Sequence, residues 1–261
     1  MKNLIGIIFF SAVLCSSANA QFEDYKIVDL SYPFDENTIY WPTEEGFKLE
    51  VEFFGTTEKG YHYSANKFCT AEHGGTHMDA PIHFYAGRNT VDEVPLDKLF
   101  GKAVVIDYSE ECGNDRDFRF SIKHFENWEK ENGIIPEGAI VLLKTGYGKY
   151  WNDREKYMGT NEHGIDAVAK LHFPGLHPQA AEWLVNERKI KAVGIESPSI
   201  DYGQSTLFES HVILGKNNVP ILENVANLDK LPAKNFYVIA LPMKIKGGSG
   251  GPTRIIAVVK N

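Results

Sequence analysis

Residues 73–84 read HGGTHMDAPIHF and hold three histidines, one aspartate, two glycines and one proline. The polar groups are His73, His77, Asp79 and His83, all at odd positions. Successive side chains of a strand point to opposite faces, so an extended chain would direct all four to the same side. The glycines and the proline disfavour a regular helix. The segment therefore predicts a strand entering a bend, with imidazoles and a carboxylate converging on one pocket.

This set of side chains is typical of a site for a divalent transition metal, because imidazole and carboxylate groups bind zinc, manganese or iron when deprotonated. A structural polar cluster is the alternative, since a single histidine on an apolar face usually has only a local partner. Four such groups in one short segment fit that alternative less well, because every buried polar group needs its own partner. We therefore favour a metal or catalytic site and leave the identity of the ion open.

The composition is that of an ordinary globular protein with a sizeable core: 261 residues, 43% hydrophobic and 24% charged. Its formal net charge of -8 gives no electrostatic support for a nucleic-acid or anionic-membrane partner. Two cysteines lie beyond the first 20 residues, Cys69 and Cys112. The sequence leaves open whether they form a disulfide or stay free, because it does not give their separation.

Residues 1–20 have the pattern of a secretory signal peptide. A lysine provides a positive start, an apolar run covers residues 4–14, and Ala-Asn-Ala at 18–20 is a small-residue cleavage site. The apolar run is too short for a membrane span. We expect one mature domain, residues 21–261, that is secreted or otherwise exported to the extracellular space, the periplasm or the secretory pathway, with no membrane partner after cleavage.

The mature chain mixes strand and helix patterns, which predicts an α/β fold with a mixed, partly antiparallel sheet. Apolar spacing after Ser121 and Pro178 predicts two helices. Expected strands cover residues 25–30, 47–54, 61–70, 103–108, 139–145, 192–195, 221–223, 236–241 and 253–259. The last two have no helix between them, which favours a hairpin. Pairing of the strands before residue 73 would give the histidine segment a rigid base.

Residues 73–84 resemble the signature of cyclase-type metal hydrolases, the family of bacterial kynurenine formamidases and isatin hydrolases. That signature is His-X-Gly-Thr-His-X-Asp-X-Pro-X-His, and this chain matches every fixed position. Residues 194–201 (GIESPSID) are similar to a later family stretch in which Glu196 stands for an aspartate. The similarity spans roughly residues 25–259. It implies a single swivelling β/β/α-type domain that forms a homodimer or a larger homo-oligomer.

The resemblance also implies metal ligands, residue by residue. His73, His77 and Asp79 would hold one divalent ion. Asp79, His211 and Glu223 would hold a second, with Asp79 bridging the two. The implied cofactor is Zn²⁺, one or two ions per chain, with Mn²⁺ as the alternative.

Two further roles follow from the resemblance. His83 would be the acid/base, and an imidazole suits that role because its pKa is near neutral. Trp41 would contact the substrate, although an aromatic side chain in such a loop is equally a packing residue. His211 on its own, next to polar neighbours, would be read as a surface histidine; Glu223 twelve residues later is what suggests a ligand.

Together these features predict a metal-dependent amidohydrolase of the arylformamidase kind. A bound divalent metal can lower the pKa of a water toward about 7 and polarise a carbonyl. The first candidate substrate is N-formyl-L-kynurenine, which would give kynurenine and formate.

Two alternatives stay open. Residues 227–234 resemble isatin hydrolases, which open a cyclic amide and tend to use one manganese ion without the later glutamate; Glu223 favours the formamidase. A secreted binding protein that keeps the metal scaffold without turnover is suggested by the export signal. It is opposed by His83, which binding alone would not need.

Overall fold

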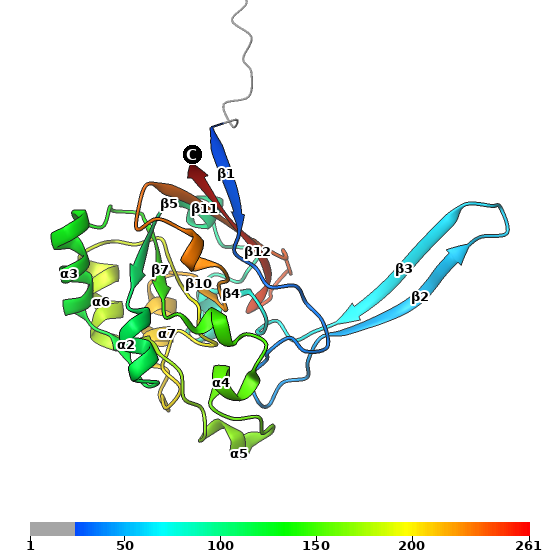
Figure 1. Ribbon diagram of the computed structural model, residues 1–261, viewed down its shortest axis with the longest axis horizontal. Helices are drawn as coiled ribbons and strands as arrows, with labels where there is room; N and C mark the ends of the chain where they lie inside the picture. Colours follow the sequence, from blue (N-terminus) through cyan, green and yellow to red (C-terminus); the bar gives the residue numbers. More distant parts are fainter. Residues whose placement is uncertain (1–23) are drawn as a thin grey trace, which may run out of the picture.

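The computed structural model describes residues 24–261, so the signal peptide expected at residues 1–20 lies outside the described residues (Figure 1). The elements in chain order are β1 (Tyr25–Asp29), β2 (Lys48–Thr56), β3 (His62–Cys69), β4 (His77–Asp79), η1 (Pro81–His83), α1 (Leu96–Leu99), β5 (Phe100–Asp107), α2 (Ser109–Asn114), β6 (Arg119–Phe120), α3 (Ile122–Asn132), β7 (Ile140–Lys144), η2 (Tyr147–Tyr150), α4 (Arg154–Met158), α5 (Ile165–Val168), β8 (Gly175–Leu176), α6 (Pro178–Asn186), β9 (Ala192–Ile195), α7 (Glu209–Lys216), β10 (Ile221–Glu223), η3 (Leu228–Lys230), β11 (Phe236–Pro242) and β12 (Gly250–Lys260).

The main sheet is mixed and closes on itself. Its order is β1-β12-β11-β5-β7-β9-β10-β4, and β4 also pairs with β12. Strands β5, β7, β9 and β10 are parallel neighbours, whereas the pairings of β4, β11 and β12 are antiparallel. The α/β prediction with a partly antiparallel sheet is therefore confirmed, as is the closing β11–β12 hairpin. Sheet closure was not predicted.

The parallel strands separate two apolar clusters. In β5, Val104 and Ile106 pack in one cluster while Ala103 and Val105 pack in the other. Helices α3 and α6 contribute to the first cluster, and β1, β11 and β12 contribute to the second. Both faces of these strands are thus buried, which explains their uninterrupted apolar runs. Figure 1 shows α3 and α6 together on the outer side of the sheet.

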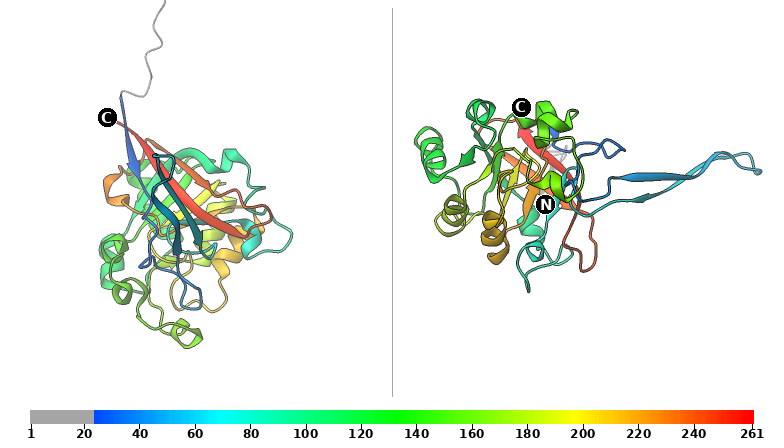
Figure 2. Two further views of the ribbon diagram at one scale, coloured as in Figure 1. Left: turned by 90° about the vertical axis from the view of Figure 1, so that its right-hand side faces the viewer. Right: turned by 90° about the horizontal axis from the view of Figure 1, so that it is seen from below.

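Strands β2 and β3 pair only with each other and form an arm, Lys48–Cys69, that projects from the body (Figures 1 and 2). The predicted pairing is confirmed, but the prediction that it forms a rigid base for the site is wrong. Almost every side chain of the two strands is exposed. An alternating pattern predicts a strand with one buried face, but it does not say which surface covers that face.

Two other questions are answered in the described part of the chain. Cys69, at the root of the arm, and Cys112, buried in α2, are both free thiols. Among residues 24–261, no helix combines the length and the apolar character that crossing a membrane requires.

Candidate metal-binding active site

The candidate ligands come from the seam where the sheet closes. His77 and Asp79 lie in β4, and Glu223 lies opposite His77 in the neighbouring β10. His77 and Asp79 stand on either side of Met78 in the strand, so their side chains point to the same face of the sheet. His211 reaches the same place from α7, a helix that the sequence did not predict. It is only 3% exposed, so the reading of His211 as a surface histidine is wrong.

His73 and His83 reach the site through bends rather than through a continuous strand. Gly75, between His73 and β4, has a φ of +56°, a conformation that favours glycine. His83 ends the short helix η1. The prediction of one strand entering a bend is therefore correct only for His77 and Asp79.

Buried imidazole nitrogens and carboxylate oxygens face one another at short distances. Asp79 Oδ1 lies 2.7 Å from His73 Nδ1 and 3.1 Å from His77 Nε2. Asp79 Oδ2 lies 3.2 Å from His211 Nε2. Glu223 approaches His211 Nε2 at 3.2 Å and His77 Nε2 at 3.5 Å. The Asp79 carboxylate thus faces His73 and His77 with one oxygen and His211 with the other.

The other ring nitrogen of each imidazole has a partner of its own. His77 Nδ1 lies 2.9 Å from the carbonyl oxygen of Gly75, and His211 Nδ1 lies 2.7 Å from Asp201 Oδ2. His73 Nε2 lies 2.8 Å from Ser249 Oγ. Such outer contacts fix the orientation of metal-binding histidines.

Burial and mutual charge shift the pKa values of these groups. Burial alone would lower the pKa of His211, but hydrogen bonds to Asp201 and Asp79 outweigh it and raise that pKa well above its usual value. Burial would likewise raise the pKa of Asp79, but the neighbouring imidazoles hold it well below the usual range. The pKa of Glu223 is raised, first by burial and then by the charge of Asp79.

These residues fit a divalent metal ion. His77, Asp79 and Glu223 are buried, and they offer ligand atoms that all lie within 4.8 Å of one another; so do those of the set His73, Asp79 and His83. Two carboxylates buried together repel each other unless a positive charge lies between them. His73, His77, Asp79, His211 and Glu223 are the residues that would hold such an ion. The donor set does not select zinc over manganese or iron.

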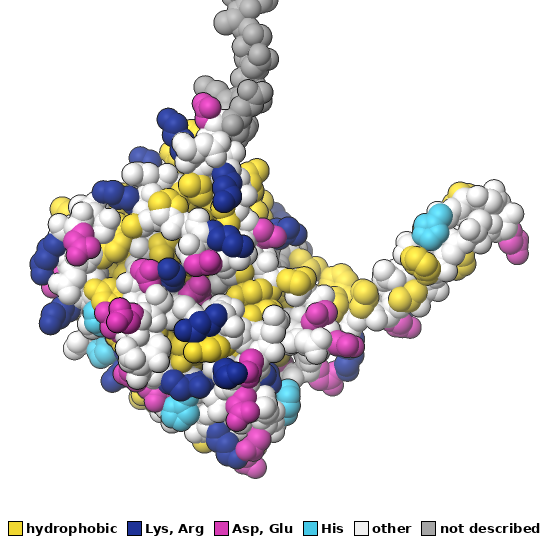
Figure 3. Space-filling model, viewed as in Figure 1, with side chains coloured by type: hydrophobic (Ala, Val, Ile, Leu, Met, Phe, Trp, Pro, Cys, Tyr) yellow, Lys and Arg dark blue, Asp and Glu magenta, His cyan; other side chains and the backbone are white. Residues whose placement is uncertain are grey.

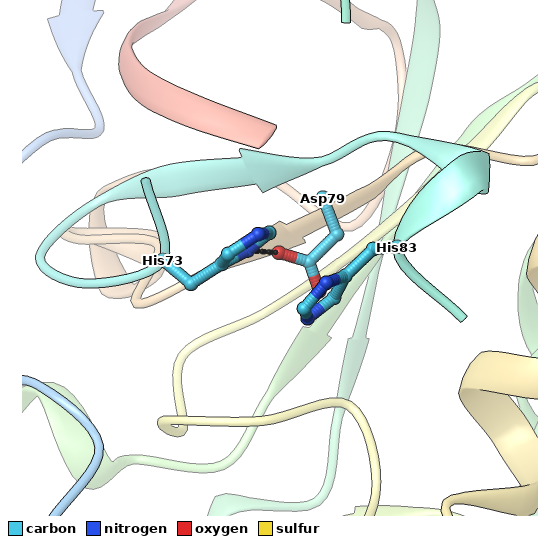
Figure 4. A group of neighbouring side chains, drawn as sticks. All are labelled: His73, Asp79 and His83. Carbon is cyan, nitrogen blue, oxygen red and sulfur yellow. Dashed lines mark hydrogen bonds and ion pairs between the residues drawn. The ribbon is translucent and has the colours of Figure 1, made fainter. Parts of the chain in front are cut away.

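His83 lies at the open side of this cluster. Its ring stacks on that of His73, with 3.6 Å between centroids, and Figure 4 shows both rings next to the Asp79 carboxylate. Solvent reaches the ring from the cavity, yet the protein around it and the neighbouring imidazoles lower the pKa of His83 to about 4, against the opposing charge of Asp79. His83 is therefore neutral at pH 7 and can accept a proton.

A cavity of about 420 Å³ opens onto the cluster. Its wall includes Trp41, Phe84 and Phe208, and the Trp41 ring contacts those of Phe173 and Phe208 edge-on at centroid distances of 6.4 and 6.2 Å. The volume is that of a small-molecule site. Trp41 therefore both packs against its neighbours and lines the cavity, so its two predicted roles are not exclusive.

Several polar residues of the site were not predicted, Asp201, Asn224 and Ser249 among them. Asp201, 2% exposed, accepts hydrogen bonds from the backbone and the side chain of His211. Asn224 lines the cavity directly after Glu223. Ser249 contacts His73 from the segment 247–251, whose sequence GGSGG has the Gly-X-Ser-X-Gly spacing. That spacing was the available signal for Ser249, and the acid that ends residues 194–201 was the signal for Asp201.

The closed mixed sheet carries at its seam a buried imidazole–carboxylate cluster, a donor set that suits a divalent metal ion. Residues 28–202 match the model of the Cyclase family, and the chain belongs to that family. The resemblance predicted from residues 73–84 is thereby confirmed.

Known relatives are hydrolases. Isatin hydrolase of Roseibium aggregatum is 35% identical over 77% of this chain and 76% of its own length. Kynurenine formamidase of Bacillus cereus is 28% identical over 88% of this chain and 95% of its own length. The structure of isatin hydrolase A from Labrenzia aggregata, bound to benzyl benzoate, superposes with a TM-score of 0.82 at 32% identity, covering 91% of this chain and 95% of that one. An isatin hydrolase bound to the product analogue thioisatinate gives the same TM-score at 30% identity, covering 91% and 94%.

The chain is accordingly a hydrolase, and its family and its histidine–carboxylate cluster indicate a metal-dependent one. These similarities support an enzyme over the alternative of a binding protein without turnover. Which of the two activities it carries is not decided by these similarities, because both kinds of relative cover most of the chain.

Proposed function

We propose that this enzyme hydrolyses the carbon–nitrogen bond of a small aryl amide, with N-formyl-L-kynurenine as the first candidate substrate. The observation that carries the proposal is the position of His83, a neutral base, between the buried ligand cluster and an aromatic-walled cavity. Glu223 contacts His77 and His211 in the cluster. Isatin hydrolases tend to lack this later glutamate, so its presence favours the formamidase.

The residues divide the work of hydrolysis. A divalent ion held by the cluster would supply Lewis acidity toward the scissile carbonyl. His83 accepts the proton of the attacking water and returns it to the leaving nitrogen. Trp41 and the phenylalanines of the wall contact the aryl ring and hold the amide next to His83.

The test is formate release from N-formylkynurenine by the mature chain loaded with zinc, compared with His83→Ala. Loss of an acid/base costs about 10²–10⁴-fold in rate, so we expect a loss of that size. His163→Ala is the matched control, because His163 is exposed and lies outside the cavity lining. Equal rates for the parent and His83→Ala would refute the role of His83.

Isatin is the second candidate, favoured by the 35% identity and the TM-score of 0.82 to isatin hydrolases. The same preparation is assayed for ring opening of isatin. Turnover of isatin together with one metal ion per chain would replace the formamidase proposal. Two ions per chain together with formate release would support it.

A serine nucleophile is the chemical alternative that the geometry itself raises. Ser249 Oγ, His73 and Asp79 Oδ1 form a chain of contacts of 2.8 and 2.7 Å, as in a serine–histidine–aspartate triad. However, the Ser249 hydroxyl donates to Glu72 Oε2 at 2.6 Å, so it accepts from His73 rather than giving up its proton to it.

Ser249→Ala separates the two chemistries. If Ser249 only orients His73, the loss at saturating zinc is about 10–100-fold or less. Loss of a nucleophilic serine costs about 10⁶-fold. A loss of the latter size, unaffected by chelators, would refute the metal-dependent route.

We further propose that two copies of the chain associate through the arm. Phe54 is 75% exposed, Val51 61% and Leu49 57%, and Figure 3 shows hydrophobic side chains along the arm, away from the body. An isolated two-stranded hairpin is marginally stable in water, and apolar patches of this kind mark interaction surfaces. A second copy would cover them.

The molar mass in solution tests this association. We expect a dimer or larger for the parent and a monomer for the double variant Val51→Lys, Phe54→Glu. Lys59→Glu, in the polar tip of the arm, is the control and should not change the mass. A monomeric parent would contradict the proposal.

Export of the chain is also proposed, on the signal pattern of residues 1–20. N-terminal sequencing of protein recovered outside the cytoplasm should begin at Gln21. Ile8→Arg, which interrupts the apolar run, should retain the full-length chain inside. Full-length chain outside the cytoplasm would argue against cleavage.

A further inference from the structure

Asn224 follows Glu223 directly, lines the same cavity and is 2% exposed. Its backbone is left-handed, with a φ of 52°. Few side chains other than Asn and Asp adopt that region, because the Cβ atom clashes with the backbone there. The residue at this position therefore both shapes the end of β10 and places a buried amide next to the ligands.

The amide connects the two segments that supply the ligands. Asn224 Nδ2 donates a hydrogen bond of 2.7 Å to the carbonyl oxygen of Gly75. In return, Thr76 Oγ1 donates 2.8 Å to the carbonyl oxygen of Asn224. Two hydrogen bonds thus join residues 75–76 to Asn224, which lies 148–149 positions later in the chain. They lie directly beside the β4–β10 pairing.

The same carbonyl of Gly75 orients His77. It accepts from His77 Nδ1 at 2.9 Å, so the proton is on Nδ1 and Nε2 is free to face Asp79 and Glu223. Gly75 has a φ of +56°, where no side chain restrains the peptide. Its carbonyl is therefore held in direction by the amide of Asn224.

The orientation of the amide is itself fixed. Tyr157, which is fully buried, has its hydroxyl 2.8 Å from Asn224 Oδ1 and in contact with the carbonyl of Glu196, so these two acceptors share its single O–H hydrogen. The carbonyl oxygen of Gly75 can only accept, so Nδ2 must face Gly75, which leaves Oδ1 facing the hydroxyl of Tyr157. Every hydrogen-bonding atom of the Asn224 side chain is thus engaged on one side or the other of the ligand seam.

We propose that Asn224 is a positioning residue for the metal, which fixes His77 through Gly75 and places Glu223 through its own backbone. This inference rests on the metal-dependent function proposed above and adds a residue outside the predicted ligand set. Contacts of this kind around metal ligands change metal affinity by about 10–100-fold when removed.

Asn224→Gly is the informative variant, because glycine keeps the left-handed backbone while the amide is lost. The matched control is Asn227→Gly. Asn227 has the same kind of backbone, with a φ of 58°, and its Nδ2 donates 2.8 Å to the carbonyl of Asp29, away from the ligands. Each variant loses a hydrogen bond from a left-handed asparagine to a distant carbonyl, and the unfolding measurement below separates a loss of stability from a loss of zinc affinity.

The measurement is Zn²⁺ affinity by competition with a chromogenic chelator, with urea unfolding in the presence of a chelator measured in parallel. We expect about 10–100-fold weaker zinc binding for Asn224→Gly and unchanged binding for Asn227→Gly. Parental affinity in Asn224→Gly would overturn the inference while leaving the metal site intact. A parent that binds no zinc would instead overturn the metal site itself, and this inference with it.

Tyr157→Phe serves as the second variant, should Asn224→Gly not fold. It removes only the hydroxyl that fixes the amide, within a side chain of nearly equal size. We expect a smaller loss of zinc affinity in the same direction. An unchanged affinity here, in a folded protein, would also count against the inference.

Discussion

Glu196 has a side chain one methylene group longer than aspartate, and this length decides which groups its carboxylate contacts. The family stretch has an aspartate here, whereas the Glu196 carboxylate reaches the backbone N–H groups of Thr145 and Gly146 at 2.9 and 2.6 Å. It thereby holds the turn after β7 instead of entering the ligand cluster. Burial raises its pKa to about 7, and the two N–H groups offset burial only in part.

That pKa predicts a pH-dependent stability. The folded chain keeps a proton on Glu196 between pH 4.5 and about 7 that the unfolded chain releases, so the contribution is full below pH 4.5 and is lost as the pH rises toward 7. The shift corresponds to about 3 kcal/mol. Urea unfolding should show that the parent loses this free energy of unfolding as the pH rises from 4.5 to 7.5. Glu196→Gln has no group to titrate here, so its stability should not fall in this way. Parallel pH curves would contradict this.

Among the elements, the seam between β12 and β4 has no room for a side chain at Gly250. A Cβ atom on Gly250, which pairs with Asp79, would lie 2.5 Å from His73 Cε1 and 2.6 Å from the carbonyl oxygen of Met78. Close packing at this position therefore sets both the closure of the sheet and the place of one candidate ligand.

Gly250→Ala should lower the free energy of unfolding by about 1–3 kcal/mol, the usual cost of overpacking, and should weaken zinc binding by displacing His73. Gly113→Ala is the control, because no atom lies within 4 Å of a Cβ built there. Urea unfolding and zinc titration of both variants provide the measurement. A Gly250→Ala protein as stable as the parent would contradict the prediction, because it would mean that the backbone at this seam can move to accommodate a methyl group.

What the sequence could predict at this scale depended on how local each signal was. The apolar runs of β5 and β7 and the spacing after Ser121 are local, and they gave these elements correctly. The burial of His211 depends on contacts of α7 with distant segments, and the pairing of β4 with both β10 and β12 joins residues far apart in the chain. The exposed arm differs from a buried hairpin only in what lies next to it, which no local pattern records.

For the whole molecule, the cluster predicts that metal binding and stability are linked. Asp79 and Glu223 are buried side by side, and a divalent ion would remove their mutual repulsion in the folded chain only. Zinc at 100 times its dissociation constant should add about 2.7 kcal/mol to the free energy of unfolding. For a domain of this size, that raises the melting temperature by about 5–10 °C.

Thermal unfolding with zinc, with magnesium and with a chelator measures this effect. Magnesium is the control, because it prefers oxygen ligands in an octahedral arrangement. Identical melting temperatures in zinc and in chelator would mean that no ion binds to the folded state at this cluster.

The strand that closes the sheet, β4, also carries His77 and Asp79, and its two neighbours come from the last forty-one residues of the described chain. The set His77, Asp79 and Glu223 therefore cannot assemble before β10 has been synthesised. An ion that needs Glu223 as a ligand would bind only after β10 has paired with β4, so the ion acquired there would depend on the compartment in which the chain folds. For a protein that leaves the cytoplasm before folding, the cytoplasmic metal pool would have no influence on the ion it carries.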